Sequence, residues 1–394
     1  MHKKRYVILD ALRGFAILGI ILANFPEFSL WSFSDPSTWT RTDFITRAVQ
    51  TFFVDGKFYT LFSLLFGMGF SIQLSRLEGK VRIFYRRMCV LFVIGLLHLC
   101  FLWSGDILLL YAVCGMLLPL FRKLPLRGLL AVAGGLFLAP VMLDAVFGSR
   151  LADPLEREQW RICGLYGITE ANFGTWLSDA RSYREVLQFL HQGAVERMWE
   201  FVSGHRLFKV LGLFIVGFAM GRERIYADLD GNKPLLKKIL AWGLALGLPV
   251  SVLYTWSAMQ GHPWGRVVHD LFYLLSVYPM GFAYAAGFAL LFARSENAPG
   301  WQLLSKPGRI ACTNYLSQSL IGILLFYGIG LGLGNRVGLL GTELIALGVY
   351  AFQVLFSILW LRPFAYGPVE WVWRMLTYGK KLPLRRQEPF RENS

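Results

Sequence analysis

GLLHLCFLWSGDILLLYAVCG, residues 95–115, is an almost wholly apolar stretch that contains one histidine, His98, and one aspartate, Asp106. Two apolar runs, approximately 88–104 and 106–121, meet at the tripeptide SGD. Each run is short for a full membrane span, and so little chain separates them that we predict a tight helical hairpin with Asp106 at its tip. An ionisable group in such surroundings is costly unless it has a partner or contacts water, so both residues are candidates for a function.

The composition of the 394 residues indicates a membrane protein. Hydrophobic residues make up 55% of the chain and charged residues only 16%, whereas soluble domains contain about 25% charged residues. We therefore predict an all-α polytopic membrane protein in which ten apolar runs are transmembrane helices. These runs are approximately 8–24, 54–75, 88–104, 106–121, 128–147, 206–221, 239–257, 268–293, 310–330 and 343–361.

The basic residues predict the orientation of the chain. There are 40 Lys and Arg against 25 Asp and Glu, and they cluster between the apolar runs. This pattern favours anionic lipid headgroups over nucleic acid as the partner. One set of short loops contains Lys3, Lys4 and Arg5, a basic segment at 76–87 that includes Lys80, and a basic tail, while the opposite short loops have few basic residues. By the positive-inside rule, both termini are cytoplasmic and the hairpin tip faces outward.

One long segment, residues 148–205, is predicted to lie outside within what is otherwise a single membrane domain, 1–394. Its part YREVLQFLHQGAVERMWEFV, residues 183–202, has apolar residues at helical spacing. We predict an amphipathic helix that lies on the membrane surface or forms a lid, in preference to an independent domain. The predicted apolar stripe consists of Leu187, Leu190, Ala194, Met198 and Phe201.

Polar residues at both ends of the first apolar run form the first candidate motif, LDALRGFAILGIILAN, residues 9–24. Asp10 and Arg13 are three residues apart and can pair across one helical turn. Asn24 lies at the outer end of the run. From these residues alone, an arginine anchored at the interface with an aspartate partner is the simplest interpretation.

A group of arginines follows in RLEGKVRIFYRRM, residues 76–88. Topology alone explains such a cluster, but Arg82, Arg86 and Arg87 also present guanidinium groups at helical spacing, which suits a phosphorylated ligand on the cytoplasmic side. The sequence contains no G-x-x-x-x-G-K-[ST] loop, so nucleotide hydrolysis is not expected.

The third motif is TNYLSQSL, residues 313–320, where Asn314 and Gln318 share one helical face. Such residues commonly form hydrogen bonds between membrane helices, and binding of a substrate is the alternative. No group of His, Cys or carboxylate residues has the spacing of metal ligands, so no metal is expected.

Five segments together resemble the YeiB-type family of bacterial inner-membrane proteins over nearly the whole chain. They are LDALRGFAILGIILAN (9–24), GKFYTLFSLLFGMGF (56–70), YRRMCVLFVIGLLHLCFLWSGDILLLYAVCG (85–115), RIACTNYLSQSLIGILLFYGIGLGLG (309–334) and GPVEWVWRMLTYGKKLPLRR (367–386). More distantly, the first segment is similar to the start of the transmembrane acyltransferase superfamily, which includes heparan-α-glucosaminide N-acetyltransferase and bacterial O-acyltransferases. In that superfamily an inner arginine is followed after ten residues by His or Asn, a spacing that Arg13 and Asn24 keep.

The resemblance implies transfer of an acyl group from cytoplasmic acyl-CoA, acetyl-CoA or longer, to an extracytoplasmic acceptor such as a glycan or lipid-linked sugar. The heparan enzyme is thought to use a histidine in its first luminal loop, and residues 25–53 of this chain contain none. His98 is the replacement within the bundle, as general base with Asp106 orienting its ring. The implied site comprises His98, Asp106 and Asn24 for catalysis, Arg13, Arg82, Arg86 and Arg87 for the CoA, and Asn314 and Gln318 for the substrate.

Two other functions remain open from the sequence. In a transporter or lipid flippase, His98 and Asp106 would lie in a proton or substrate path, but no inverted repeat is visible. A structural or signalling membrane protein fits the composition equally well and explains His98 least. Membrane lipids are expected partners in every case, nucleic acid is not, and the sequence allows a homodimer.

Overall fold

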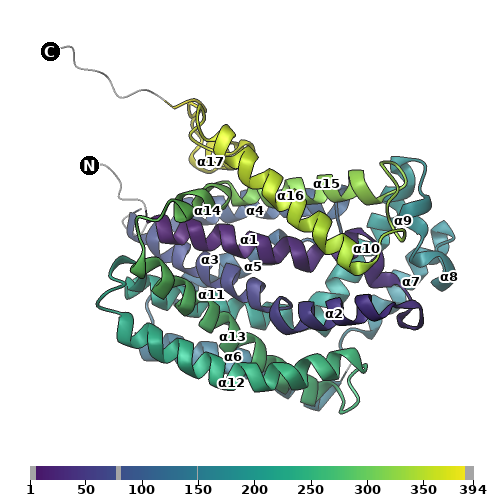
Figure 1. Cartoon of the computed structure of the whole chain (residues 1–394), viewed down its shortest axis with the longest axis horizontal. Helices are drawn as coiled ribbons and strands as arrows, with labels where there is room; N and C mark the ends of the chain where they lie inside the picture. Colours follow the sequence, from purple (N-terminus) through teal and green to yellow (C-terminus); the bar gives the residue numbers. More distant parts are fainter. Residues whose placement is uncertain (1–5, 77–80, 149, 387–394) are drawn as a thin grey trace.

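The computed structural model describes residues 6–76, 81–148 and 150–386. Lys3, Lys4, Arg5 and Lys80 of the predicted cytoplasmic clusters lie outside these residues. Every regular element in the described part is a helix, apart from one isolated antiparallel β-bridge between Phe364 and Arg385 (Figure 1). The all-α prediction is therefore confirmed.

Long helices dominate the chain, and each of the ten predicted apolar runs contains helix. The helices of ten or more residues are α1 (Val7–Phe28), α2 (Arg41–Phe53), α3 (Lys57–Arg76), α4 (Val81–Phe101), α5 (Leu108–Leu117), α6 (Leu126–Phe147), α7 (Asp153–Tyr166), α10 (Tyr183–Ser203), α11 (Arg206–Arg222), α12 (Lys233–Met259), α13 (Arg266–Arg294), α14 (Pro299–Arg309), α15 (Ala311–Phe326), α16 (Leu339–Trp360) and α17 (Pro368–Tyr378).

Short helical turns connect some of these elements. They are the 3₁₀ helices η1 (Trp31–Phe33), η2 (Pro36–Thr38), η3 (Leu118–Phe121) and η4 (Ile225–Ala227), together with the short α-helices α8 (Glu170–Phe173) and α9 (Trp176–Asp179).

Seven helical segments in the described residues have the length and composition of a membrane span, or eight if the bent pair α10–α11 crosses as one. The predicted count of ten is therefore not confirmed. Two of the predicted spans are short apolar helices, Leu108–Phe121 and α15, and a third, α11, has 17 residues. A helix of 16 residues rises only about 24 Å, less than the roughly 30 Å hydrocarbon layer.

Apolar side chains on the outside of the bundle support a multi-pass membrane protein. Trp242 on α12 is 75% exposed, Val146 on α6 is 70% exposed and Phe352 on α16 is 59% exposed. Meanwhile several ionisable side chains, including His98 and Asp106, are buried. This distribution is inverted relative to that of a soluble domain and suits a lipid environment.

Glycines allow the closest helix contacts. A Cβ atom at Gly95 on α4 would lie 2.5 Å from the backbone nitrogen of Leu109 on α5, so only glycine permits the predicted hairpin to close. At the crossing of α3 and α11, a Cβ at Gly217 would lie 2.1 Å from the carbonyl oxygen of Leu64. Such small-residue contacts are the usual way in which membrane helices approach closely.

The two ends of the bundle differ in structure. The start of α1 and the amphipathic helix α17 lie at one end, and α7, α8 and α9 lie at the other (Figure 1). Consequently α7, α8 and α9 form a helical cap on the end opposite α17. We predict that this end faces outward.

The helix predicted at 183–202 exists as α10, but its predicted placement was wrong. α10 buries Val186, Phe189, Gly193 and Arg197 and continues into α11 through a bend of 65°. It is thus an integral part of the bundle instead of a helix resting on its surface. The predicted apolar stripe is confirmed in part, because Leu190 is buried and Leu187 and Phe201 pack against the core, but Arg197 is buried with ionic partners as well.

Candidate functional site

His98 and Asp106 form the predicted contact at the tip of the α4–α5 hairpin. Nδ1 of His98 lies 2.7 Å from Oδ2 of Asp106, and the side chains are 1% and 0% exposed. The other oxygen of Asp106, Oδ1, accepts a hydrogen bond of 2.7 Å from the backbone N–H of Leu109 in the first turn of α5. The carboxylate is therefore fixed by a helix start and in turn fixes the imidazole.

The second ring nitrogen of His98 also has a partner. Nε2 lies 2.8 Å from Oγ of Ser319 on α15, a residue that is 1% exposed. The imidazole ring is packed against the rings of Tyr315 and Trp103, with centroid distances of 5.3 and 6.2 Å. His98 is thus held by hydrogen bonds on both sides and by aromatic rings.

A cavity of about 470 Å³ adjoins this group. Gly105 and Ile107, the two neighbours of Asp106 in the chain, form part of its wall, as does Tyr315. The volume lies within the range of small-molecule sites. His98 and Asp106 themselves are located behind this part of the wall. Helices α1, α3, α10, α11, α12 and α13 supply most of the remaining lining.

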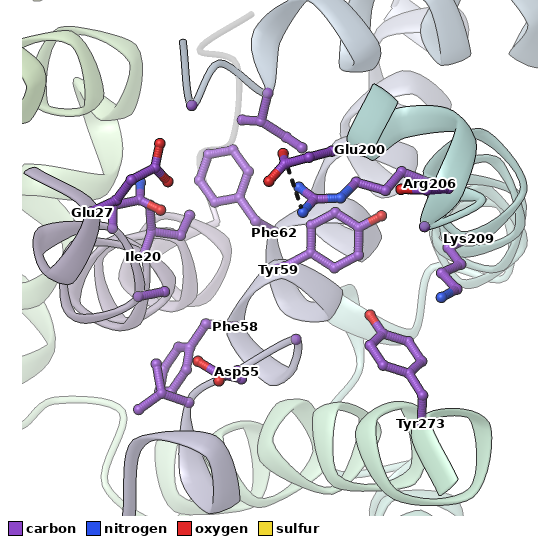
Figure 2. A pocket seen from close by; sticks show the side chains of 18 of the residues that line it. Ile20, Glu27, Asp55, Phe58, Tyr59, Phe62, Glu200, Arg206, Lys209 and Tyr273 are labelled. Atoms are coloured by element: carbon purple, nitrogen blue, oxygen red, sulfur yellow. Dashed lines mark ion pairs between the residues drawn. The ribbon is translucent and has the colours of Figure 1, made fainter. Parts of the chain in front are cut away.

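Ionisable and aromatic side chains line the cavity together. Figure 2 shows Glu27 of α1 on one side, Glu200 and Arg206 at the break between α10 and α11 on the other, and Tyr59 of α3 between them. The carboxylate of Glu200 lies 3.5 Å from the guanidinium of Arg206. Among the described residues the buried hydroxyl of Tyr59 has no hydrogen-bond partner, so it is available to a ligand.

Arg197 connects the cavity to the hairpin. Its Nε donates a hydrogen bond of 2.8 Å to the carbonyl oxygen of Ser104 in the α4–α5 turn. Its Nη1 is ion-paired with Glu200 one turn further along α10. Because Arg197 is only 7% exposed, both contacts are needed to offset the cost of burying its charge.

A second buried group lies on the α6, α11 and α13 side. Nε2 of His205 is 2.7 Å from Oδ1 of Asp144, and Nζ of Lys209 is 3.2 Å from Oδ1 of Asp270. The ligand atoms of Asp144, His205 and Asp270 lie within 4.8 Å of one another, so this trio is the one that fits a metal ion within the described part of the chain. Lys209 already supplies a positive charge to the two carboxylates, and the absence of a metal remains our prediction.

Two further histidines face the cavity from the α12–α13 connection. The rings of His262 and His269 are 3.9 Å apart between centroids, and Nδ1 of His269 lies 3.1 Å from Oγ of Ser257. Burial and the nearby Arg266 guanidinium lower the pKa of His262 in the loop. His262 is therefore neutral at neutral pH and able to accept a hydrogen bond from a ligand.

Strained backbone marks the break between α10 and α11. His205 has a left-handed conformation with φ of 48°, which is unusual for a residue with a side chain. The break directs His205, Arg206 and Lys209 toward the interior at the level where the chain changes direction. Such strain is maintained only where the surrounding structure compensates for it, and it occurs preferentially at functional sites.

The polar residues of the first predicted motif, residues 9–24, lie at the two ends of α1. Arg13 donates a 3.0 Å hydrogen bond from Nη1 to Oδ1 of Asp10, as predicted. Asn24, eleven residues further along α1, lines the cavity. The inner arginine and the outer asparagine thus lie on one helix, but only Asn24 is near the His98 group.

The predicted CoA-binding arginines lie on the first turns of α4, far from the cavity lining. Arg82 and Arg86 are exposed, and the guanidinium of Arg87 stacks over the ring of Trp373 on α17 at 4.4 Å. Their role in binding phosphate stays a prediction.

Asn314 and Gln318 join α15 to α16. Nδ2 of Asn314 donates to Oγ of Ser357 at 3.1 Å, and Nε2 of Gln318 donates to Oε1 of Gln353 at 3.0 Å. Both side chains are buried and neither lines the cavity, which favours the interhelical interpretation over substrate binding. Their side-chain oxygens have no partner among the described residues, so substrate binding stays untested.

Several lining residues were not predicted, although a signal was present. Lys209 and Asp270 lie inside the predicted spans 206–221 and 268–293, and charged residues inside a span are a standard indicator of function. Glu27 directly follows the predicted first span and was passed over in favour of Asn24. Ser319, behind the cavity wall, was not predicted either, because nothing in its spacing marks it among the polar residues of TNYLSQSL.

Comparisons with known proteins agree on a family. Residues 220–380 match a family described as "Protein of unknown function (DUF418)". The uncharacterized protein YxaH of Bacillus subtilis is 30% identical over 98% of this chain and 98% of its own length. The uncharacterized protein YeiB of Escherichia coli is 31% identical over 95% and 96%, and an uncharacterized 39.9 kDa protein of Bacillus acidopullulyticus is 29% identical over 97% and 96%.

Proposed function

We propose that this chain, which belongs to the YeiB family of membrane proteins, moves an acyl group from cytoplasmic acyl-CoA to an acceptor beyond the cytoplasmic membrane. The observation that carries the proposal is the hydrogen bond between His98 and Asp106 directly behind a polar cavity. An ionised aspartate on Nδ1 keeps the proton there and leaves Nε2 as the basic nitrogen. A general base in this position can accept the proton of a hydroxyl group during acyl transfer.

The cavity is the proposed acceptor site. Its lining combines carboxylates, guanidinium groups and aromatic rings, including Glu27, Arg206, Tyr59 and Tyr273. Hydrogen-bond donors and acceptors in the lining suit an acceptor molecule that is rich in hydroxyl groups, and aromatic side chains suit the apolar faces of a sugar ring. A glycan or lipid-linked sugar therefore matches the lining better than a purely apolar lipid.

The donor is proposed to enter from the opposite end along α4. Arg87 and His98 are eleven residues apart on this helix, which corresponds to a rise of about 16 Å. A donor with phosphates at one end and a long thioester arm, such as acyl-CoA, can contact the arginines and still bring its thioester near His98. This arrangement agrees with the predicted orientation of the chain.

Purified protein in nanodiscs provides the test. Acyl-CoA should bind, and repeated release of free CoA thiol, beyond one equivalent per protein, should require an acceptor fraction from the cell envelope. The variant Asn24→Ala should bind acyl-CoA normally but respond less to the acceptor, because Asn24 lines the proposed acceptor site. If neither acyl-CoA binding nor thiol release occurs with any envelope fraction, the acyltransferase proposal is wrong.

A transporter remains the second candidate because of the broken helix pair. The 65° bend between α10 and α11 lies at His205, and Lys209 just after it pairs with Asp270 of α13; broken helices with ionisable residues are common at transporter sites. Solute or proton flux in proteoliposomes without acyl-CoA would favour transport. Flux that vanishes in Lys209→Met but persists in His98→Gln would separate this function from acyl transfer.

A further inference from the structure

Ser319, His98 and Asp106 form a continuous hydrogen-bonded chain across α15, α4 and the α4–α5 turn. The distances are 2.8 Å from Ser319 Oγ to His98 Nε2 and 2.7 Å from His98 Nδ1 to Asp106 Oδ2. Ser319 and His98 are 221 residues apart in the sequence. Their meeting is therefore a product of the tertiary fold and not of local helix geometry.

The proton positions follow from the acceptors. Asp106 uses Oδ1 to accept the N–H of Leu109, and its remaining oxygen faces Nδ1 of His98. An ionised carboxylate only accepts, so Nδ1 would carry the proton, and in a neutral imidazole Nε2 would then have the free electron pair. The hydroxyl of Ser319 then donates to Nε2. This is the arrangement of a serine nucleophile, its base and the carboxylate that orients the base.

The burial of Asp106 supports a role beyond joining two helices. A serine and a histidine suffice to connect α4 to α15, whereas an aspartate with no exposed surface adds a large desolvation cost in a membrane protein. That cost is understandable where the carboxylate stabilises a positive charge on the imidazole during a reaction.

We propose that Ser319 is the nucleophile of the reaction and carries the acyl group as an ester; this inference rests on the proposed acyl transfer. His98 removes the proton of Ser319 Oγ as the oxygen attacks the thioester carbonyl. The carbon–sulfur bond then breaks, and His98 delivers the proton to the leaving CoA thiolate.

The acceptor reacts in the second half of the cycle. Its hydroxyl group gives its proton to His98 and attacks the ester carbonyl. The bond to Ser319 Oγ breaks, and the same proton returns to Ser319. Acyl-CoA and acceptor are thereby converted to CoA and acylated acceptor with no other reactant.

Tyr315 controls access to this group. It lies one helical turn before Ser319 on α15, contacts the His98 ring and lines the cavity. Its hydroxyl is 3.5 Å from the carbonyl oxygen of Gly105, at the limit of a hydrogen bond, so packing against the core and the His98 ring is its main constraint. A closed wall excludes water and protects the ester from hydrolysis, and a side-chain rotation of Tyr315 would admit the acceptor.

Two labelling reactions test the inference. A fluorophosphonate probe reports an activated serine without any acyl donor, and intact-mass spectrometry after incubation with acetyl-CoA, without acceptor, reports the acyl-enzyme. Wild-type protein and Tyr315→Ala, which opens the wall, should carry both adducts on Ser319. Ser319→Ala should carry neither and should lose transfer by roughly 100-fold or more.

Two further variants test whether labelling and transfer depend on the side chain at position 319. Ser317→Ala, two residues away on the same helix, should label and turn over like the wild type. Ser319→Cys should form an acyl thioester that neutral hydroxylamine removes, a signature that a merely structural serine would not produce. Retained acyl-CoA binding and monodisperse elution show that each variant is folded.

The outcomes separate this inference from the proposed function. If folded Ser319→Ala transfers acyl groups at the wild-type rate while His98→Gln does not, Ser319 is not the nucleophile and His98 acts directly on the acceptor. If acetyl-CoA never reacts but the probe labels Ser319, the serine is activated and the CoA donor is wrong. If no acyl transfer occurs and the probe labels neither wild type nor Tyr315→Ala, the inference is overturned.

Discussion

Charged side chains have opposite environments at the two ends of the bundle, the end that contains the cavity and the end that carries Arg82, Arg86 and Arg87. Around the cavity, His98, Asp106 and Arg197 are buried, and each is held by partners from other helices. At the opposite end, Arg82 and Arg86 are exposed on a single helix. A buried charge depends on an assembled set of partners, whereas an exposed charge is solvated without them. We therefore expect changes at the cavity end to have larger effects.

The largest effect is expected at the base. His98→Gln keeps one hydrogen bond but cannot take up a proton at neutral pH, so transfer should fall about 10²- to 10⁴-fold. The measurement is the rate of CoA thiol release with acceptor present. The control is His191→Gln, an exposed histidine that contacts Tyr166 on the cap. Equal rates in both variants would remove His98 from the mechanism.

Stability should change most at Arg197. Arg197→Met removes the hydrogen bond to the carbonyl oxygen of Ser104 and one of the two cationic partners of Glu200, and the loss of a hydrogen bond from a charged group costs about 1.5–3 kcal/mol. We expect a clearly lower melting temperature in detergent. Arg184→Met, an exposed change on the same helix, should leave it unchanged. If the two variants have the same melting temperature, the contacts of Arg197 on α10 do not stabilise the hairpin.

An intermediate effect is expected at the opposite end. The double change Arg86→Gln and Arg87→Gln should weaken acyl-CoA binding roughly tenfold or more, since a hydrogen bond to a charged group contributes about 1.5–3 kcal/mol. Lysine at both positions should restore only part of the affinity, because it lacks the planar guanidinium. Calorimetric titration with acyl-CoA measures the affinity of the glutamine variant and of the lysine variant.

Lys237→Gln with Lys238→Gln is the matched control, because it removes two basic residues at the start of α12, away from α4. Unchanged affinity in the arginine variant would leave these residues with a role in topology alone.

The smallest effect is expected at Glu370 on α17. Its Oε1 accepts the backbone N–H groups of Cys312 and Thr313 at 2.7 and 3.1 Å, so it caps α15 from another helix. Glu370→Ala should lower stability by about 0.5–2 kcal/mol, the usual value of a helix cap. Glu370→Gln keeps a side-chain oxygen that can accept both N–H groups, so it should melt nearer to the wild type than Glu370→Ala does. A larger loss of stability in Glu370→Gln than in Glu370→Ala would contradict the capping role.

The sequence by itself determined the class of protein and its local contacts. Long apolar runs predicted the helices, and short spacings predicted the pairs Asp10–Arg13 and His98–Asp106, because a helical turn or a tight hairpin brings such residues together whatever the rest of the chain does. The number of spans was less secure, since apolar composition does not distinguish a full span from a shorter buried helix such as α5 or α15.

Only the tertiary structure decided which distant residues meet. Ser319 reaches His98 because α15 packs beside the hairpin, and Arg206 and Lys209, just after the break at His205, line the cavity together with residues from distant helices. The physical reason is that burial in a helical bundle depends on the packing of faces from many helices. The sequence pattern did not predict that Arg197 is buried, because the partners that make its burial tolerable include Ser104, 93 residues away, as well as Glu200 on its own helix.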